Sequence, residues 1–295
     1  MKNLKGIVLL VLANALIFIT LSITFTVLVQ FVLPAFGIDL RGSVNQSLLL
    51  WSFVIGFGGA FISLLLSKHL ARAGLRAVRI TQPRTADEQL IYRTVEDLSR
   101  RLNITMPEVW IYDAPDPNAF ATGPSKNNAM VAVSTGLLRQ LDERGVQAVV
   151  AHEMGHVFNG DMFATTVLMG LMNTFVYFIS NIITRHVAER NQLLAFVTYF
   201  FIQTVLSFLA MIPICYFSRR REFRADRYAA TVFGAEAMIS ALQGIDRFVR
   251  GGRVQYSTQD ALATMKISGN SRGWLHLFST HPPIEARIAA LRTAA

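Results

Sequence analysis

Cysteine is almost absent from this sequence of 295 residues, and charged side chains are few. The one cysteine, Cys215, excludes an internal disulfide and a metal site built from several thiolates, so any bound metal would use histidine and carboxylate ligands. Charged residues make up only 16% of the chain and apolar residues make up 52%. That balance is too apolar for an ordinary soluble domain, and it indicates membrane spans.

The sequence also lacks a glycine-rich phosphate loop and a basic surface interleaved with aromatic residues, which argues against a nucleic-acid partner despite the formal charge of +9. Instead, the basic residues follow apolar segments. One cluster contains Lys68, Arg72, Arg76, Arg79 and Arg84, and no acidic residue lies between Lys68 and Asp87. A second cluster contains Arg219, Arg220 and Arg221. Such clusters mark cytoplasmic membrane edges and attract anionic lipid headgroups.

Four apolar segments predict four transmembrane or membrane-embedded helices, at about residues 7–36, 48–66, 162–183 and 193–217. The first has no small-residue cleavage site, so we expect a retained anchor. The basic cluster after the second segment places the end of that segment in the cytoplasm, and the amino terminus is then cytoplasmic as well. Glycines in the second, at Gly56, Gly58 and Gly59, predict close helix packing. The last two form a hairpin that crosses the membrane. A hairpin that enters without crossing is an alternative, because Asn173 and Asn181 dilute the third segment.

Residues 67–161 and 218–295 form two parts of one cytoplasmic domain of the α+β class, mainly helical. The first part is expected to contain a helix at 86–102 and strands at 109–112, 118–122 and 129–134, with residues 123–128 linking the last two strands. Ser134 or Thr135 caps a short helix, and Asp142 caps the next one. The second part is expected to contain helices near 221–233, 236–249 and 283–292, with a polar link from Gly251 to Asp260.

The sequence AHEMGHVFNGD, from Ala151 to Asp161, contains the pattern H-E-x-x-H. On a helix, His152 and His156 lie one turn apart on the same face, where both imidazoles can reach one metal ion, usually zinc. Glu153 follows the first histidine and can take a proton from a water at the metal. The alternative is that these three side chains merely lie on a solvated helix face.

Two histidines leave a catalytic zinc site one protein ligand short. Glu222 follows the fourth apolar segment by five residues, and His156 precedes the third by six. If the helices continue, both lie roughly 7–9 Å beyond the apolar boundary at 1.5 Å per residue. An antiparallel hairpin would therefore bring His152, His156 and Glu222 together on the cytoplasmic side, as a two-histidine, one-glutamate site with a fourth position open to water.

Asp226 follows Glu222 by one helical turn and shares its face. If Glu222 binds the metal, Asp226 can accept a hydrogen bond from the second nitrogen of a ligand histidine and fix that ring. The alternative is that both acids pair with Arg219, Arg224 or Arg227 on a solvated helix face.

Four short motifs, together with the order of the apolar segments, make the whole chain resemble the HtpX-type membrane metalloproteases of the M48 peptidase family. The motifs are HEMGH at 152–156 with Asp161 beyond it, REFRAD at 221–226, NAFATG at 118–123 and STHPP at 279–283. The resemblance implies a zincin-like domain that holds one Zn²⁺ per chain through His152, His156 and Glu222, with Glu153 as the catalytic base.

The resemblance further implies a multi-pass protein of the bacterial inner membrane that cleaves misfolded or damaged membrane proteins on the cytoplasmic side, in quality control and stress response. A homo-oligomer or a quality-control partner is compatible with that role. The resemblance also marks a strand that includes Asn118, Ala119 and Phe120 as an edge strand that pairs with substrate, with core packing as the alternative. His281 is a candidate for contact with the oxyanion or for the open zinc position, against a plain loop histidine before a helix started by Pro282 and Pro283.

Three other functions are alternatives to a cytoplasmic-side endopeptidase. An intramembrane metalloprotease would bury its H-E-x-x-H within an apolar segment, and residues 147–161 are too polar for that. A zinc-binding scaffold or holdase that does not cleave is disfavoured by the intact Glu153. A processing protease for prenylated CAAX proteins would need more spans than four.

Overall fold

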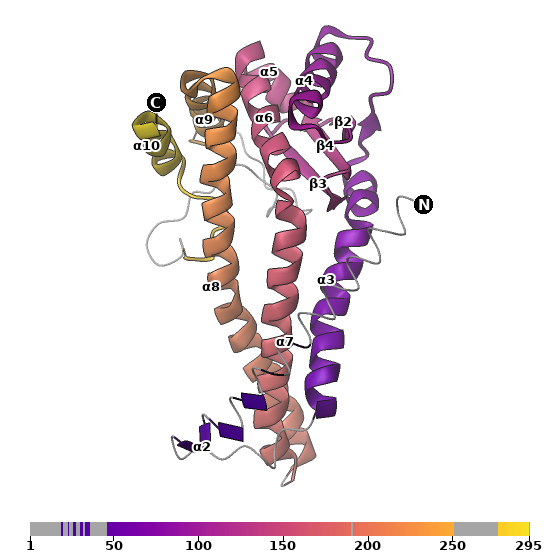
Figure 1. Cartoon of the computed structure of the whole chain (residues 1–295), viewed down its shortest axis with the longest axis vertical. Coiled ribbons are helices and arrows are strands. Elements are labelled where there is room, and N and C mark those ends of the chain that lie inside the picture. Colours follow the sequence, from indigo (N-terminus) through magenta and orange to yellow (C-terminus); the bar gives the residue numbers. More distant parts are fainter. Residues whose placement is uncertain are drawn as a thin grey trace. The chain divides into compact units, whose positions relative to one another are not determined.

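The computed structural model describes residues 46–189, 191–250 and 277–294, together with a few positions between 19 and 35. Its contacts divide the chain into two compact units, one of residues 1–60 and 169–210 and the other of residues 61–168 and 211–295. Three long helices, α3 (Gln46–Leu75), α7 (Asp161–Ala188) and α8 (Gln192–Phe233), contribute residues to both units (Figure 1).

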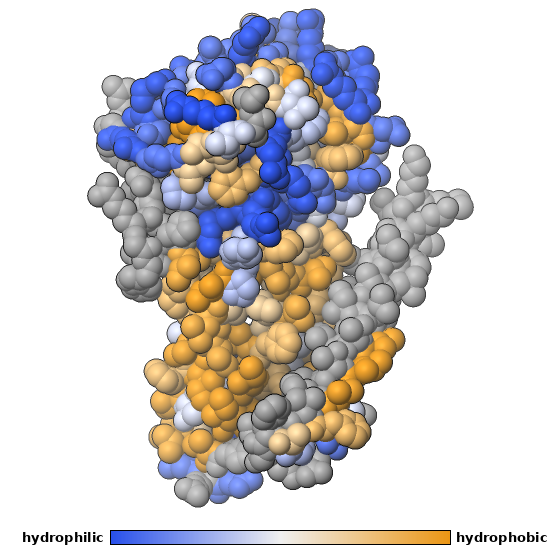
Figure 2. All heavy atoms as spheres, turned by 60° about the vertical axis from the view of Figure 1, so that its left-hand side comes forward, coloured by the Kyte–Doolittle hydropathy of each residue, from blue (hydrophilic) through white to orange (hydrophobic). Residues whose placement is uncertain are grey.

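Within the described part of the chain, three helices are long and apolar enough to cross a membrane, over Ser47–Leu75, Asp161–Arg185 and Gln192–Phe233. The segments expected at 48–66, 162–183 and 193–217 each lie inside one of them. Their exposed surface is largely apolar, as at Trp51 and Leu193, which are 63% and 73% exposed (Figure 2). The segment expected at 7–36 lies outside the described residues, apart from a few positions that include α2 (Leu33–Ala35).

In the first unit, a glycine allows close contact between α3 and α7. A Cβ atom on Gly56 would lie only 2.5 Å from the backbone nitrogen of Thr174. The expected role in helix packing is therefore confirmed for Gly56. Gly58 and Gly59 have open space around them among the described residues, so no such role is seen there.

The second unit contains a four-stranded sheet in the order β1-β2-β4-β3. Its strands are β1 (Val78–Arg79), β2 (Glu108–Tyr112), β3 (Ala119–Ser125) and β4 (Asn128–Ser134). β2 and β4 are parallel, and the other pairs are antiparallel. β3 therefore lies at one edge of the described sheet.

The link expected at residues 123–128 was wrong, because most of it is strand. β3 continues to Ser125, and β4 begins at Asn128. The sequence Gly123-Pro124 resembles a turn, but it lies at an irregularity in the pairing between Thr122 and Ser125. Gly123 has φ +144°, and a Cβ atom there would lie 2.3 Å from the carbonyl oxygen of Asn128, so glycine is required.

Helix boundaries in the second unit follow their capping residues. Thr85 and Glu88 form a capping box at α4 (Ala86–Leu102), which has the expected bounds. The side chain of Ser134 caps α5 (Thr135–Gln140), and that of Asp142 caps α6 (Glu143–Asn159), so both expected caps are confirmed. The remaining helices are α9 (Ala235–Arg250) and α10 (Ile284–Ala294), the latter beginning directly after Pro283.

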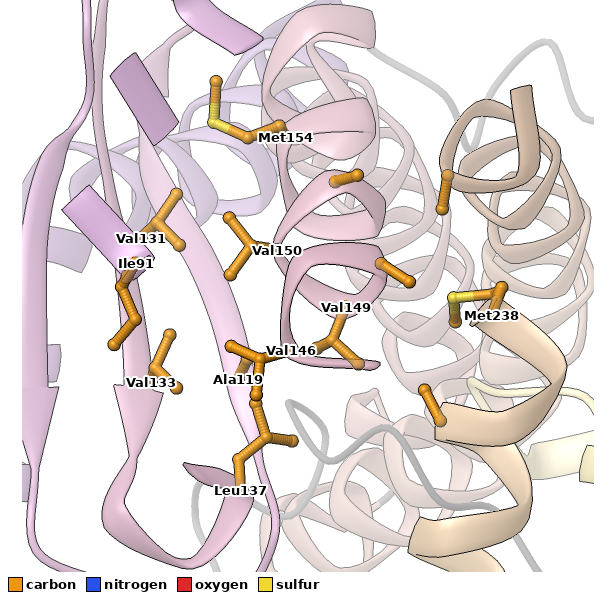
Figure 3. Close-up of a cluster of buried hydrophobic side chains, with 14 of the residues drawn as sticks. Ile91, Ala119, Val131, Val133, Leu137, Val146, Val149, Val150, Met154 and Met238 are labelled. Atoms are coloured by element: carbon orange, nitrogen blue, oxygen red, sulfur yellow. The ribbon is translucent and has the colours of Figure 1, made fainter. Parts of the chain in front are cut away.

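The helix α6 is buried on two sides, between the sheet and α9 (Figure 3). One core cluster contains three valines of α6 together with residues of both neighbours. Its members include Val146, Val149 and Val150 of α6, Val131 of β4 and Met238 of α9, and all five are at most 2% exposed. A helix that is apolar on more than one face is expected to be buried in this way. The H-E-x-x-H residues thus lie on an element held rigidly from both sides.

The assumption that the helices continue past the apolar boundary holds for one of the two. α8 runs unbroken from the apolar segment through Glu222, so the helix expected near 221–233 is its carboxyl-terminal part. α6 instead ends at Asn159, because Gly160 takes up a left-handed conformation with φ +68°. α7 begins at the next residue, Asp161.

Candidate metal centre

Two helices bring the three predicted ligands together within the second unit. His152 and His156 come from α6, and Glu222 comes from α8. Gly155 allows this approach, since a Cβ atom there would already lie 3.4 Å from the Cα atom of Ala225 on α8. A larger side chain between the two histidines would push α8 away from them.

The donor atoms of these three residues all lie within 4.8 Å of one another. The Nε2 atoms of His152 and His156 are 3.2 Å apart, and the Glu222 oxygens lie 3.5 Å from the first and 3.2 Å from the second. The two imidazole rings are nearly perpendicular, at 88°. Two imidazoles and one carboxylate converging on one point fit a single divalent cation with a fourth position left for water or substrate.

Each histidine is oriented by a carboxylate behind it. The Nδ1 atom of His152 lies 2.9 Å from Asp226, and that of His156 lies 2.7 Å from Asp161. A carboxylate can only accept a hydrogen bond, so both Nδ1 atoms donate, and in the neutral imidazoles that would bind a metal both Nε2 atoms are electron-pair donors. Metal-ligating histidines usually have such partners.

Arg287 of α10 completes the network, and no sequence pattern indicates this role. Its side chain is fully buried and forms a fork on Asp226, with Nε 2.8 Å from one carboxylate oxygen and Nη2 2.5 Å from the other. Its Nη1 lies 3.5 Å from Glu222. The solvated-face alternative required Asp226 to pair with Arg219, Arg224 or Arg227. Asp226 instead pairs with the buried Arg287.

Asp161 is the second group that sequence reasoning did not assign, although it was noted as part of a motif. Its side chain is 3% exposed and accepts hydrogen bonds from His156 and, at 2.6 Å, from Arg224. Arg221 donates to the Asp161 carbonyl at 2.7 Å. Its position directly after the glycine that ends α6 was the available signal, because that turn folds the first residue of α7 back toward His156.

Glu153 is buried beside the cluster at 5% exposure. Burial raises the pKa of the Glu153 carboxyl, and the neighbouring Glu222 adds to the rise, against the opposing effect of the two histidines. For His156, burial alone would lower the pKa, but hydrogen bonds to Asp161 and Glu222 raise it to about 10. Raised pKa values in a buried cluster of this kind are typical of functional sites.

His281 lies at the cluster as well. Its Nδ1 is 2.8 Å from Glu222, and Ser279 donates a hydrogen bond to its backbone carbonyl at 2.7 Å. Arg219 donates to the carbonyls of Leu277 and Ser279, which holds the segment in front of α10. The structure thus brings His281 to the carboxylate of Glu222 rather than leaving it on a free loop.

The predicted substrate strand begins one residue later than expected. Asn118 precedes β3, where its amide side chain donates to the hydroxyl of Tyr112 at 3.0 Å. Ala119 and Phe120 lie in β3 and are buried at 0% and 4% exposure. Their burial agrees with the core-packing alternative for the side chains, while no described strand pairs with the outer edge of β3, the kind of edge to which a further chain can add.

The fold and the site define a metalloprotease, and comparison with known proteins agrees. Residues 85–295 match the model of Peptidase family M48, and the chain belongs to that family. The "Protease HtpX homolog" of Neisseria meningitidis serogroup C is 43% identical over 282 residues, covering 94% of this chain and 98% of its own length. The "Protease HtpX" of Nitrosococcus oceani is 42% identical over 299 residues, covering 98% and 99%.

Among solved structures, S. mikatae Ste24p has the same fold, with a TM-score of 0.59 at 15% identity over 96% of this chain and 65% of that one. Family membership, the metal-binding cluster and the three long apolar helices together show a membrane-bound metalloprotease. The expected family resemblance and the expected enzyme class are confirmed.

Proposed function

We propose that this chain is a zinc-dependent endopeptidase that cleaves unfolded or damaged membrane proteins on the cytoplasmic side of a bacterial inner membrane. His152, His156 and Glu222 hold one zinc ion, and Asp226 and Asp161 orient the two histidines. The observation that carries the proposal is the convergence of three donor atoms within 4.8 Å, each imidazole backed by a carboxylate.

At these ligands a zinc ion supplies Lewis-acid activation of the scissile carbonyl and of the attacking water. Glu153 takes one proton from that water while the oxygen of the water forms a bond to the carbonyl carbon. Glu153 then delivers the proton to the amide nitrogen, so that the carbon–nitrogen bond breaks and the amine leaves. A raised pKa suits both halves of this transfer, because a carboxyl that holds its proton more tightly is a better base and still a competent acid.

Three further roles complete the proposal. The backbone of β3 pairs with an extended substrate, which favours unfolded chains over folded ones. His281, beside Glu222, is the candidate donor to the developing oxyanion. The basic residues that follow α3 and α8 keep the catalytic unit at the cytoplasmic membrane edge.

The test is cleavage of an unfolded model protein by the full chain purified in detergent, with and without added zinc. Wild type and the Glu153→Gln variant are compared side by side, with zinc content measured for each. We expect zinc-dependent cleavage by wild type alone and equal zinc content in both. Equal cleavage by the two proteins would refute the role of Glu153, and no cleavage by either, with one zinc per chain, would favour the scaffold reading.

A further inference from the structure

The carboxyl-terminal part of α8 carries five arginines, and three of them are engaged within the second unit. Arg219 donates to backbone carbonyls in the segment before His281. Arg221 and Arg224 both donate to Asp161. These three arginines therefore have structural partners.

The other two, Arg220 and Arg227, line a cavity of about 420 Å³ between α8 and α10. They are seven residues apart, close to two helical turns, so they lie on one side of α8. Both are exposed, and no ion pair or side-chain hydrogen bond is found for either within the described residues. The volume lies within the range of small-ligand pockets.

The cavity carries an excess of positive charge. Among the described residues that line it, Asp226 is the one carboxylate, and both of its oxygens are bonded to Arg287, so that pair is neutral. Arg220 and Arg227 remain as two cations for which the described part of the chain supplies no carboxylate. Apolar walls such as Leu291 strengthen their field inside the hollow, because low-dielectric surfaces focus it.

The distance of these two arginines from the apolar part of α8 indicates which anion could bind in the cavity. Phe217 is the last residue of the apolar segment, and α8 is unbroken beyond it. At 1.5 Å per residue, Arg220 lies about 4.5 Å past Phe217 and Arg227 about 15 Å past it. The headgroup layer is roughly 5–7 Å thick on each side of a bilayer, so Arg220 reaches the depth of lipid phosphates.

We propose that the cavity between α8 and α10 binds a phosphate group through Arg220 and Arg227. The depth of Arg220 favours the headgroup of an anionic phospholipid, and free phosphate is the other source of the same chemistry. Arginine suits this ligand because its planar guanidinium matches phosphate oxygens in pairs. The site requires neither zinc nor catalysis, and it rests on the function proposed above only for the membrane placement of α8.

The test is lipid binding to the full, zinc-loaded chain in detergent, counted by native mass spectrometry. Phosphatidylglycerol, phosphatidylcholine and inorganic phosphate are titrated separately. The test variant combines Arg220→Gln with Arg227→Gln, and a variant combining Arg100→Gln with Arg101→Gln on α4 is the charge-matched control. The control arginines pair with Glu96 and Asp97 and line a different cavity.

We expect phosphatidylglycerol to bind about tenfold more tightly than phosphatidylcholine, and the test variant to lose that preference while the control keeps it. Equal losses in both variants would show general attraction to a basic protein and would overturn the site. The site would also be overturned if the test variant bound phosphatidylglycerol as wild type does, or if wild type bound the two lipids equally. Within a positive result, displacement of the lipid by millimolar phosphate identifies a free-anion site, and resistance to it identifies a lipid site.

The assay separates this site from the proposed protease activity. Zinc content and cleavage are measured on the same samples. Loss of cleavage with intact lipid binding bears only on the proposed function, and loss of lipid preference with intact cleavage in mild detergent bears only on the cavity.

Discussion

The carboxylate of Asp161 joins three helices at His156, a proposed metal ligand. It begins α7, accepts a hydrogen bond from His156 of α6 and accepts another from Arg224 of α8. The ring of His156 thereby has one orientation and one tautomer before any metal arrives. This arrangement makes Asp161 a positioning residue for the proposed zinc site.

Replacing Asp161 by asparagine should weaken zinc binding by about 10–100-fold, the usual effect of removing such a partner. The amide keeps the shape of the side chain but loses the negative charge that favours donation from Nδ1. Zinc affinity can be measured by competition with a chromogenic chelator. Asp97→Asn on α4, where Asp97 pairs with the exposed Arg101, is the matched control. An affinity equal to that of wild type would show that Asp161 serves packing alone.

The residues of the site differ in how visible they were in the sequence. His152, Glu153 and His156 form a local pattern, and Glu222 could be reached by counting residues from an apolar boundary. Arg287 could not be found in this way, because a single arginine on a short helix has no distinguishing spacing. Its importance arises from burial opposite Asp226, which is a property of the tertiary structure.

At the scale of elements, Glu108 ties the end of α3 to the sheet. Lys68 donates to it at 2.6 Å, Arg72 forms a second ion pair with it, and Trp110 donates at 3.1 Å. The guanidinium of Arg72 also lies 4.7 Å from the centre of the Trp110 ring. Burial acts to raise the pKa of Glu108, but its bonds and charges from Lys68, Trp110 and Arg72 outweigh it and lower the pKa.

A carboxyl whose pKa is lower in the folded state stabilises the fold above its unfolded pKa of about 4.5, and the effect is lost as the pH falls through the folded value. Glu108→Gln should therefore lower the thermal midpoint at pH 7, by an amount corresponding to about 2 kcal/mol for the lost charged hydrogen bonds. The difference from wild type should shrink below pH 4.5, where Glu108 takes up a proton. Thermal unfolding in detergent across this pH range checks the result, and a difference independent of pH would contradict it.

Elements with strong local signals were predicted well, and those that depend on backbone conformation were not. The capping box of α4 and the caps of α5 and α6 depend on residue types within a few positions of the helix start, so the sequence shows them. The end of α6 at Gly160 depends instead on a left-handed residue, and the bulge at Gly123 depends on contact with the partner strand. The short β1 had no recognisable pattern, since only two residues form it.

For the whole molecule, the proposed zinc ion joins two segments that are distant in the sequence. A ligand that binds only the folded state stabilises it by about 2.7 kcal/mol when its concentration is 100 times its dissociation constant. Added zinc should therefore raise the thermal midpoint of the purified chain, and a chelator should reverse the rise. The shift should persist in Glu153→Gln and disappear in His152→Ala. A shift of the same size in His152→Ala would contradict the ligand assignment.

The order of the site residues along the chain has a consequence for biosynthesis. A ribosome adds roughly 5–20 residues per second, so α6 is made several seconds before Glu222 and about ten seconds before Arg287. Until then the two histidines lack their carboxylate ligand, and Asp226 lacks its buried counter-charge. The proposed zinc site and its buried supports are therefore complete only once α10, the last described helix of the chain, has been made.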